Sequence, residues 1–79
     1  MIRYSRQADK FLNRQSLKVQ ARLVAAVEEI DAGTATDIKP LKGKFSGMFR
    51  KRVGDYRIIF TREGVILLVV NINHRQGAY

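Results

Sequence analysis

Arginine side chains recur in the C-terminal half of the chain at a spacing that favours phosphate binding. Arg50 and Arg52 lie two residues apart, and Arg57 follows after the dipeptide Gly54-Asp55. A guanidinium keeps its charge at any physiological pH, and its fixed fork of donors binds phosphate oxygens in pairs. Three arginines on one surface would therefore hold a phosphate and stabilise negative charge on it, but none of them could act as a general base.

The segment NINHRQGAY carries the groups that could transfer protons. It contains an imidazole at His74, a guanidinium at Arg75 and a phenol at Tyr79. Imidazole changes its charge near neutral pH, and neighbouring cations favour the phenolate form of a tyrosine. From composition alone, His74 is as consistent with an ordinary surface histidine as with a proton-transfer group. A position beside arginines would favour the catalytic interpretation.

Length and composition limit the classes of protein to which these residues can belong. Seventy-nine residues predict one domain, residues 1–79, with a thin hydrophobic core. The absence of cysteine excludes disulfides and Cys-rich zinc sites, and a single histidine argues against a metal site. The sequence begins without the apolar stretch of a signal peptide, and its longest apolar run, residues 65–70, is too short to span a bilayer. We expect a cytoplasmic protein with no membrane partner and no small-molecule cofactor.

The chain is strongly basic, and its charge is concentrated in one segment. Fifteen Lys and Arg against seven Asp and Glu give a net charge of +8. Residues 39–62 hold eight of the basic side chains and one acidic side chain, Asp55. Nucleic acids, anionic membranes and acidic proteins are the partners that commonly offset such a charge. Lys44 and Lys51 lie in this segment and, with Arg50 and Arg52, are our candidate ligands for nucleic-acid phosphates.

Hydrophobic periodicity predicts helices in the N-terminal half. We expect a short strand over residues 2–4, a helix over residues 6–13 with Ser5 as its N-cap, and a second helix over residues 16–32 that ends at Gly33. The two helices are close in sequence and should form an antiparallel hairpin that buries its apolar side on another layer. The expected inner face of the second helix comprises Leu17, Ala21, Val24, Val27 and Ile30.

The downstream half predicts a three-stranded antiparallel meander. The segments FRKRV, YRIIF and VILLVVNI are rich in β-branched and aromatic residues, and the turns Gly54-Asp55 and Glu63-Gly64 separate them. A turn at Gly54-Asp55 places Arg52 opposite Arg57 and Arg50 opposite Ile59, so the three arginines share one face. The expected fold class is α+β, with an N-terminal helical hairpin packed on one face of a small antiparallel β-sheet.

Alternation along the strands assigns the remaining residues to two faces. The face expected to cover the helices comprises Phe49, Val53, Tyr56, Ile58, Phe60, Leu67 and Val69. The face with the arginines is expected to include Ile66, Leu68, Val70, Ile72 and His74. Like charges directly opposite each other destabilise a sheet, so the pairing of Arg52 with Arg57 favours a binding role over a structural one.

Three features of the sequence combine: Leu41 with Gly43, the run MFRKRVGDYRIIF over residues 48–60, and the pattern His74-Arg75-x-x-Ala78-Tyr79. Together they resemble the RelE branch of the RelE/ParE toxin superfamily, and the resemblance extends over nearly the whole chain. It implies a RelE-like fold with two N-terminal helices on an antiparallel sheet. It also implies a toxin of a type II toxin–antitoxin pair that enters the ribosomal A site, cuts mRNA there and inhibits translation.

The resemblance further implies roles for individual residues. Arg57 and Arg75 would stabilise the phosphate in the transition state, and Arg50 stands where related toxins commonly have a basic residue. Tyr79 or His74 would serve as the base, and the sequence does not choose between them. The implied partners of this endoribonuclease are the ribosome, mRNA and an acidic antitoxin.

Other functions are compatible with the same fold. A ParE-like toxin binds and poisons DNA gyrase without cutting RNA, and a chain that stops at Tyr79 could be an inactive, shortened toxin. A non-catalytic RNA-binding module is a further alternative, but the small number of aromatic residues for base stacking argues against it. The combination of His74, Arg75 and Tyr79 favours the nuclease.

Overall fold

The computed structural model describes residues 1–74, and its elements follow the expected order with two additions. The elements are β1 (Ile2–Tyr4), α1 (Arg6–Asn13), α2 (Leu17–Ala32), β2 (Lys39–Pro40), the 3₁₀ helix η1 (Gly43–Phe45), β3 (Phe49–Val53), β4 (Tyr56–Glu63) and β5 (Ile66–His74). The additions are β2 and η1, which the sequence pattern did not indicate. Within residues 1–74, no helix is both long enough and apolar enough to cross a membrane.

Local side-chain chemistry sets the ends of the two α-helices. The Ser5 hydroxyl accepts a hydrogen bond from the Ala8 amide at 3.1 Å, and the Ser16 hydroxyl accepts one from the Val19 amide at 3.3 Å. Gly33 ends α2 in the left-handed region, with φ at 79°. An N-cap oxygen satisfies a donor that the first helical turn leaves free, and glycine adopts a positive φ without a steric penalty. The expected helix boundaries are confirmed.

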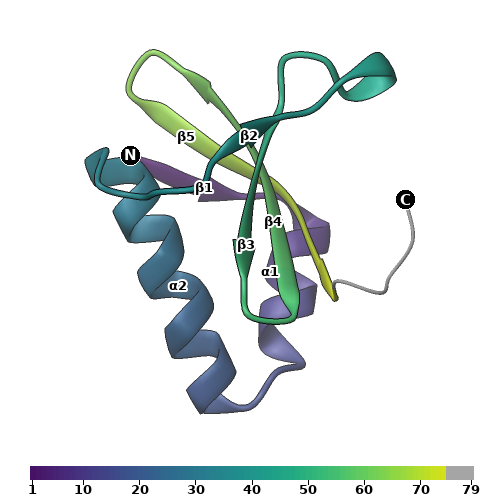
Figure 1. Ribbon diagram of the computed structural model, residues 1–79. Coiled ribbons are helices and arrows are strands. Elements are labelled where there is room, and N and C mark those ends of the chain that lie inside the picture. Colours follow the sequence, from purple (N-terminus) through teal and green to yellow (C-terminus); the bar gives the residue numbers. More distant parts are fainter. Residues whose placement is uncertain (75–79) are drawn as a thin grey trace.

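The strands form one five-stranded sheet in the order β1-β5-β4-β3-β2. Neighbours from β2 to β5 pair antiparallel, which confirms the expected meander, but β1 pairs parallel to β5. Ile2 lies opposite Leu67 and Tyr4 opposite Val69, so this pairing joins segments that are far apart in sequence. The sheet is therefore mixed rather than purely antiparallel. The α+β fold is confirmed, since α1 and α2 cover one face of the sheet (Figure 1).

The hydrophobic core lies between this face and the helices. Its fully buried side chains include Leu23 and Val27 of α2, Ile58 of β4, and Leu67 and Ile72 of β5. Each of them is at 0% exposure. Burying an aliphatic side chain of this size stabilises the fold by about 1.5–3 kcal/mol, so these few residues account for much of the stability.

The buried face of α2 differs from the expected face at its N-terminal end. Ile30 is buried as expected, but Leu17 is 82% exposed and Ala21 is also exposed. The buried face instead runs through Leu23, Ala26, Val27 and Ile30, and Val19 near the start of the helix also packs against the core. The helix is therefore rotated relative to the expected face, so that Leu17 and Ala21 point away from the sheet. A Cβ added at Gly54 would lie only 2.8 Å from Nη2 of Arg22, so the tip of the β3–β4 hairpin meets α2 there (Figure 1).

The Ser5 backbone and the Gln7 side chain complete the edge of β5 beyond the end of β1. The Ser5 amide donates to the Val69 carbonyl at 2.9 Å. The Gln7 carboxamide donates to the Ile72 carbonyl at 2.8 Å and accepts from the Ile72 amide at 2.9 Å. Gln7 thus satisfies both backbone groups of Ile72, as a neighbouring strand would.

Replacing Gln7 with leucine is expected to lower the free energy of unfolding by about 1–3 kcal/mol, because two part-buried backbone groups lose their partners. Urea denaturation measures the change. Gln20→Leu is the control, because the Gln20 carboxamide donates a single hydrogen bond, at 3.0 Å, to the Gln15 carbonyl. Equal stabilities of the Gln7→Leu variant and the unaltered protein would contradict the prediction.

Candidate functional site

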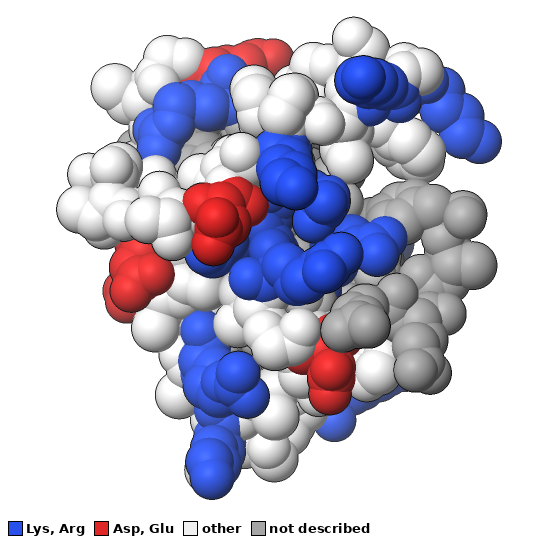
Figure 2. All heavy atoms as spheres, viewed as in Figure 1, with Lys and Arg blue, Asp and Glu red and all other residues white. Residues whose placement is uncertain are grey.

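The turn between β3 and β4 brings three arginines onto one face of the sheet. Arg52 lies opposite Arg57 and Arg50 opposite Ile59, which is the expected register. Because side chains alternate along a strand, the three arginines share the sheet face turned away from the helices, which we call the arginine face. Figure 2 shows Lys and Arg side chains gathered at the middle of the molecule, where β2 and β3 lie in Figure 1.

Two hollows lie on either side of the β3 arginines. The first, which we call the arginine hollow, has a volume of about 280 Å³ and is lined by Leu41, Lys42, Phe45, Arg50, Arg52 and Arg57. The second has a volume of about 360 Å³ and is lined by Asp37, Lys39, Arg50, Arg52 and Gly54. The arginine hollow thus has four cations and no carboxylate in its lining, so it is the better site for an anion.

Backbone hydrogen bonds hold the loop that forms one wall of the arginine hollow. The Leu41 amide donates to the Met48 carbonyl at 2.9 Å, and the Met48 amide donates to the Phe45 carbonyl at 3.0 Å. Gly43 and Gly47 have φ values of 70° and 91°, a conformation that glycine adopts far more readily than other residues. The loop is therefore a hydrogen-bonded turn that fixes the place of Phe45.

An apolar residue forms part of the arginine face. Ile59 is 2% exposed and lies opposite Arg50, outside the core cluster beneath the helices. The Nε atom of Arg57 is buried as well. Excluding water from around a guanidinium strengthens its attraction for an anion, because the local dielectric is lower. An anion bound beside Arg57 would be held more strongly than one at a fully solvated surface.

A β-bulge in β5 changes which residues face the arginines. Phe60 lies opposite Val69, but Ile59 lies opposite Asn71, so Val70 is an extra residue on the β5 side. One extra residue moves every later side chain of the strand to the other face. Asn71 and Asn73 therefore lie on the arginine face, and the Asn73 carboxamide donates to Asn71 Oδ1 at 2.9 Å.

His74 consequently lies on the opposite face of β5 from the one expected. It is opposite Tyr56, and the two rings meet edge to face with centroids 5.4 Å apart. Ile72 likewise belongs to the core rather than to the arginine face. The expected placement of both residues was wrong because of the bulge. The second turn is also at Gly64-Val65, one residue later than predicted, but that shift moves the pairing by two residues and leaves the faces unchanged.

The signal for this change is present in the sequence. Residues 65–70 are all apolar and do not distinguish the two faces, but polar Asn71 and Asn73 then flank Ile72 with period two, which marks Ile72 as the buried residue. Asn73 lies opposite Arg57. It is a candidate site residue that our sequence analysis did not identify, as are Lys39, Lys42 and Phe45.

The family assignment comes from comparison with known proteins. A family model described as the ParE toxin of type II toxin–antitoxin systems, parDE, matches residues 2–79. The chain belongs to the ParE toxin family. The expected membership of the RelE/ParE superfamily is thereby confirmed. No curated protein matches the sequence of this ParE-family toxin.

Solved structures share the fold of this ParE-family toxin. The toxin–antitoxin complex RelBE2 from Mycobacterium tuberculosis matches with a TM-score of 0.81 and 22% identity, over 95% of this chain and 96% of that chain. The RelB–RelE antitoxin–toxin complex from Methanococcus jannaschii matches with a TM-score of 0.71 and 25% identity, over 92% and 89%. YafQ from E. coli strain BL21(DE3) matches with a TM-score of 0.76 and 17% identity, over 95% and 92%. The RelE-like fold is confirmed.

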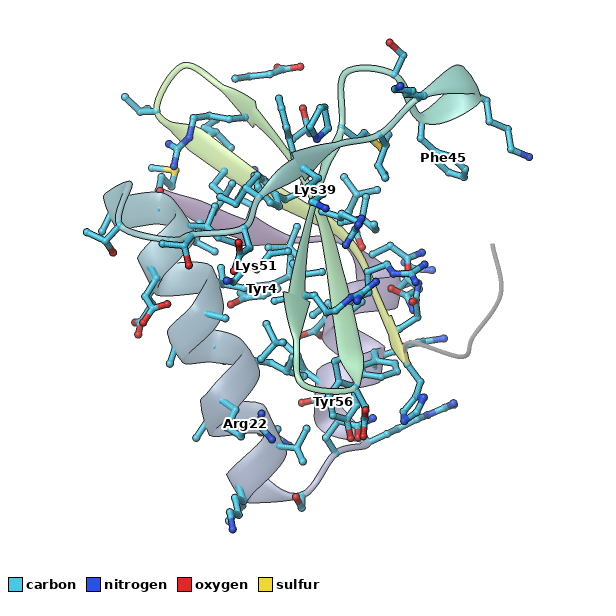
Figure 3. All side chains as sticks on the ribbon, viewed as in Figure 1. Tyr4, Arg22, Lys39, Phe45, Lys51 and Tyr56 are labelled. Atoms are coloured by element: carbon cyan, nitrogen blue, oxygen red, sulfur yellow. The ribbon has the colours of Figure 1, made fainter. Side chains whose placement is uncertain are left out.

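The other predicted site residues of the ParE-family toxin lie in different places. Lys51 lies opposite Ile58 on the helix side of the sheet, and its Nζ donates to the Thr36 carbonyl at 2.7 Å (Figure 3). It is not part of the arginine face. Lys44 is exposed on η1, with its Nζ 5.6 Å from the centroid of the Phe45 ring. Arg75 and Tyr79 lie outside the described residues.

Proposed function

We propose that this ParE-family toxin is a ribosome-dependent endoribonuclease that cuts mRNA in the A site and so inhibits translation. The observation that carries the proposal is the arginine hollow, in which Arg50, Arg52 and Arg57 meet without a carboxylate in the lining. Cleavage of RNA by its own 2′-hydroxyl builds negative charge on the phosphoryl oxygens. Preorganised cations at that position stabilise the transition state more than the ground state.

The proposed reaction is an internal transesterification. The 2′-oxygen loses its proton and bonds to the adjacent phosphorus, the bond from phosphorus to the 5′-oxygen breaks, and the leaving 5′-oxygen takes up a proton. Arg57 and Arg75 are the proposed transition-state cations, and Arg50, Arg52 and Lys44 are proposed to bind neighbouring phosphates. The position of Lys51 on the helix side argues against the same role for it.

The reaction also needs a base and an acid. Our two candidates are Tyr79 and His74. Because His74 lies on the other face of β5 from Arg57, its position favours Tyr79 as the base. His74 could act only if the end of β5 rearranged. Cleavage of mRNA by a His74→Gln variant tests whether His74 is needed.

An acidic antitoxin is the proposed partner that silences the toxin. The M. tuberculosis and M. jannaschii relatives are toxin–antitoxin complexes. The net charge of +8 and the arginine face together favour an acidic segment that folds on binding. The proposed site of action is the cytoplasm, where the toxin would meet ribosomes.

A second candidate function is inhibition of DNA gyrase without RNA cleavage. The match to the ParE toxin model favours it, because ParE-like toxins share the fold and a basic surface. An inactive toxin is the remaining alternative.

One experiment separates the three functions. The purified protein is incubated with ribosomes programmed with a defined mRNA, and primer extension maps any cut. In parallel, gyrase is assayed for trapped cleaved DNA. We expect cuts at the A-site codon and no effect on gyrase. Trapped gyrase with intact mRNA would replace the nuclease by the gyrase poison, and an intact mRNA with active gyrase would indicate an inactive toxin.

Binding to single-stranded RNA is expected to weaken steeply with salt, because each bound phosphate releases counterions. The logarithm of affinity for a 2′-O-methylated, uncleavable oligonucleotide is measured against the logarithm of salt concentration. Removing one phosphate ligand with Arg52→Gln should make the slope shallower by about 0.7. Arg6→Gln is the control, because Arg6 is an exposed residue of α1, and it should leave the slope unchanged. A flat profile for the unaltered protein would mean that the arginines are only solvated charges.

A further inference from the structure

Cations form only part of the lining of the arginine hollow. Leu41 and Phe45 also line it, and both side chains are half-buried. Phosphate binding alone requires no apolar wall, since phosphate oxygens accept hydrogen bonds from guanidinium and ammonium groups. The apolar side chains therefore point to a ligand with a flat apolar part next to its phosphate.

The position of Phe45 is fixed before any ligand binds. The Phe45 carbonyl accepts a hydrogen bond from the Met48 amide at 3.0 Å, and the Ser46 amide donates to the Gly43 carbonyl at 3.0 Å. The Thr61 hydroxyl donates to the Gly47 carbonyl at 3.4 Å, which ties the loop to β4. Figure 3 shows Phe45 on this loop, at the side of the sheet away from α2. Because the backbone of this loop is already held, less conformational entropy is lost when Phe45 binds a ligand.

Single-stranded RNA has the required combination of groups. Each nucleotide presents a flat base next to a phosphate, and unpaired bases stack on aromatic side chains while cations bind the backbone. Lys44, with its Nζ 5.6 Å from the Phe45 ring centroid, adds a cation next to the same wall. A peptide would present an apolar side chain without a regularly adjacent phosphate.

We propose that Leu41 and Phe45 form a nucleobase subsite, in which one base of a single RNA strand stacks on Phe45 while the adjacent phosphate binds Arg50 and Arg52. This inference rests on the proposed function, because the mRNA supplies the strand. Stacking accepts any base, so the subsite adds affinity and sets the register of the strand relative to Arg57.

The absence of tryptophan from the chain permits a direct test. In Phe45→Trp the introduced indole is the single tryptophan fluorophore, and a stacked base quenches it. The probes are a 2′-O-methylated oligouridine, an abasic phosphate strand of the same length and uridine monophosphate. Phe49→Trp is the matched control, because Phe49 stacks on Phe60 at 5.8 Å on the helix side of the sheet.

We expect the oligouridine to quench Phe45→Trp saturably and to bind about 5- to 100-fold more tightly than the abasic strand. Phe49→Trp should not be quenched. Equal affinities for the oligouridine and the abasic strand would overturn the base subsite. Equal affinities for the oligouridine and uridine monophosphate would overturn its assignment to a strand.

Cleavage kinetics provide the second measurement, which does not require a tryptophan. On programmed ribosomes, Phe45→Leu should raise the KM about 5- to 100-fold with kcat little changed, and Phe49→Leu should leave both unchanged. An unchanged KM for Phe45→Leu would overturn the inference while the nuclease stands. Quenching of Phe45→Trp without any mRNA cleavage by the unaltered protein would overturn the proposed function and leave the subsite in place.

Discussion

Replacing Arg57 with alanine is expected to reduce mRNA cleavage on programmed ribosomes by at least about 100-fold, because a transition-state cation in a water-poor site is lost. Arg57 lines the arginine hollow, and its Nε atom is buried there. Ribosome binding should fall far less than the cleavage rate, since the other arginines still attract phosphate. Single-turnover cleavage together with ribosome sedimentation measures both effects.

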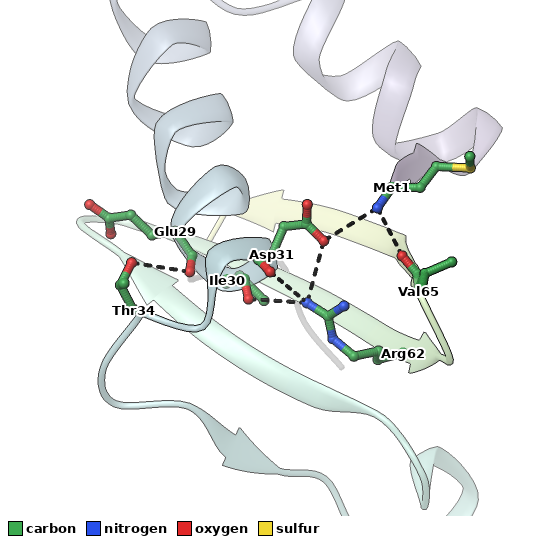
Figure 4. Close-up of polar contacts among 7 residues, drawn as sticks. All are labelled: Met1, Glu29, Ile30, Asp31, Thr34, Arg62 and Val65. Atoms are coloured by element: carbon green, nitrogen blue, oxygen red, sulfur yellow. Dashed lines mark hydrogen bonds and ion pairs between the residues drawn. The ribbon is translucent and has the colours of Figure 1, made fainter.

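Arg62→Ala is the matched control on the same strand. Arg62 points to the helix side, where its Nη2 donates to the carbonyls of Ile30 and Asp31 at 3.2 Å each and lies 3.4 Å from Asp31 Oδ1 (Figure 4). Its removal should cost about 1 kcal/mol of stability and leave cleavage unchanged. If Arg57→Ala cleaved at the rate of Arg62→Ala, the arginine face would have no part in the chemistry.

Leu23→Ala is expected to lower the free energy of unfolding by about 2–5 kcal/mol, the largest stability effect that we predict. The side chain of Leu23 on α2 faces the sheet and is at 0% exposure, so the shorter alanine side chain leaves a cavity. In a chain of 79 residues a loss of this size is a large part of the total stability. Urea denaturation followed by circular dichroism gives the value.

Leu17→Ala makes the same substitution on the same helix at a side chain that is 82% exposed. Its stability should stay within about 0.5 kcal/mol of the unaltered protein. The pair therefore tests which face of α2 is buried. A larger loss at Leu17 than at Leu23 would mean that the helix packs as its sequence pattern first suggested.

Features set by neighbouring residues could be predicted from the sequence. Ser5 and Gly33 mark helix ends through hydrogen bonds or a backbone conformation within a few residues. The Gly54-Asp55 turn fixes the register of β3 and β4, and with it the pairing of Arg52 with Arg57. The arginine face was therefore predictable because a single tight turn determines it.

Features set by distant parts of the chain could not be predicted in the same way. The exposure of Leu17 depends on which face of α2 the sheet covers, and that face runs through Leu23 and Val27. The placement of His74 depends on a bulge that shifts the pairing between Ile59 and Phe60. The aromatic wall at Phe45 depends on how residues 41–48 fold back on β3, which helical or strand periodicity does not describe.

The position of β5 between β1 and β4 has a consequence for how the toxin matures during its own synthesis. The Met1 ammonium donates to the Val65 carbonyl at 2.8 Å, and the Leu67 amide donates to the Met1 carbonyl at 2.7 Å, so the start of the chain pairs with the strand that is translated after the other four. Such pairing is slow and has to wait for β5 to emerge. Until then, α1 and α2 lack the buried side chains of Leu67, Val69 and Ile72, and Asn73 is missing from beside Arg57. On the proposed function, the site that acts on mRNA is therefore completed only when β5 joins the sheet, after most of the chain has been made.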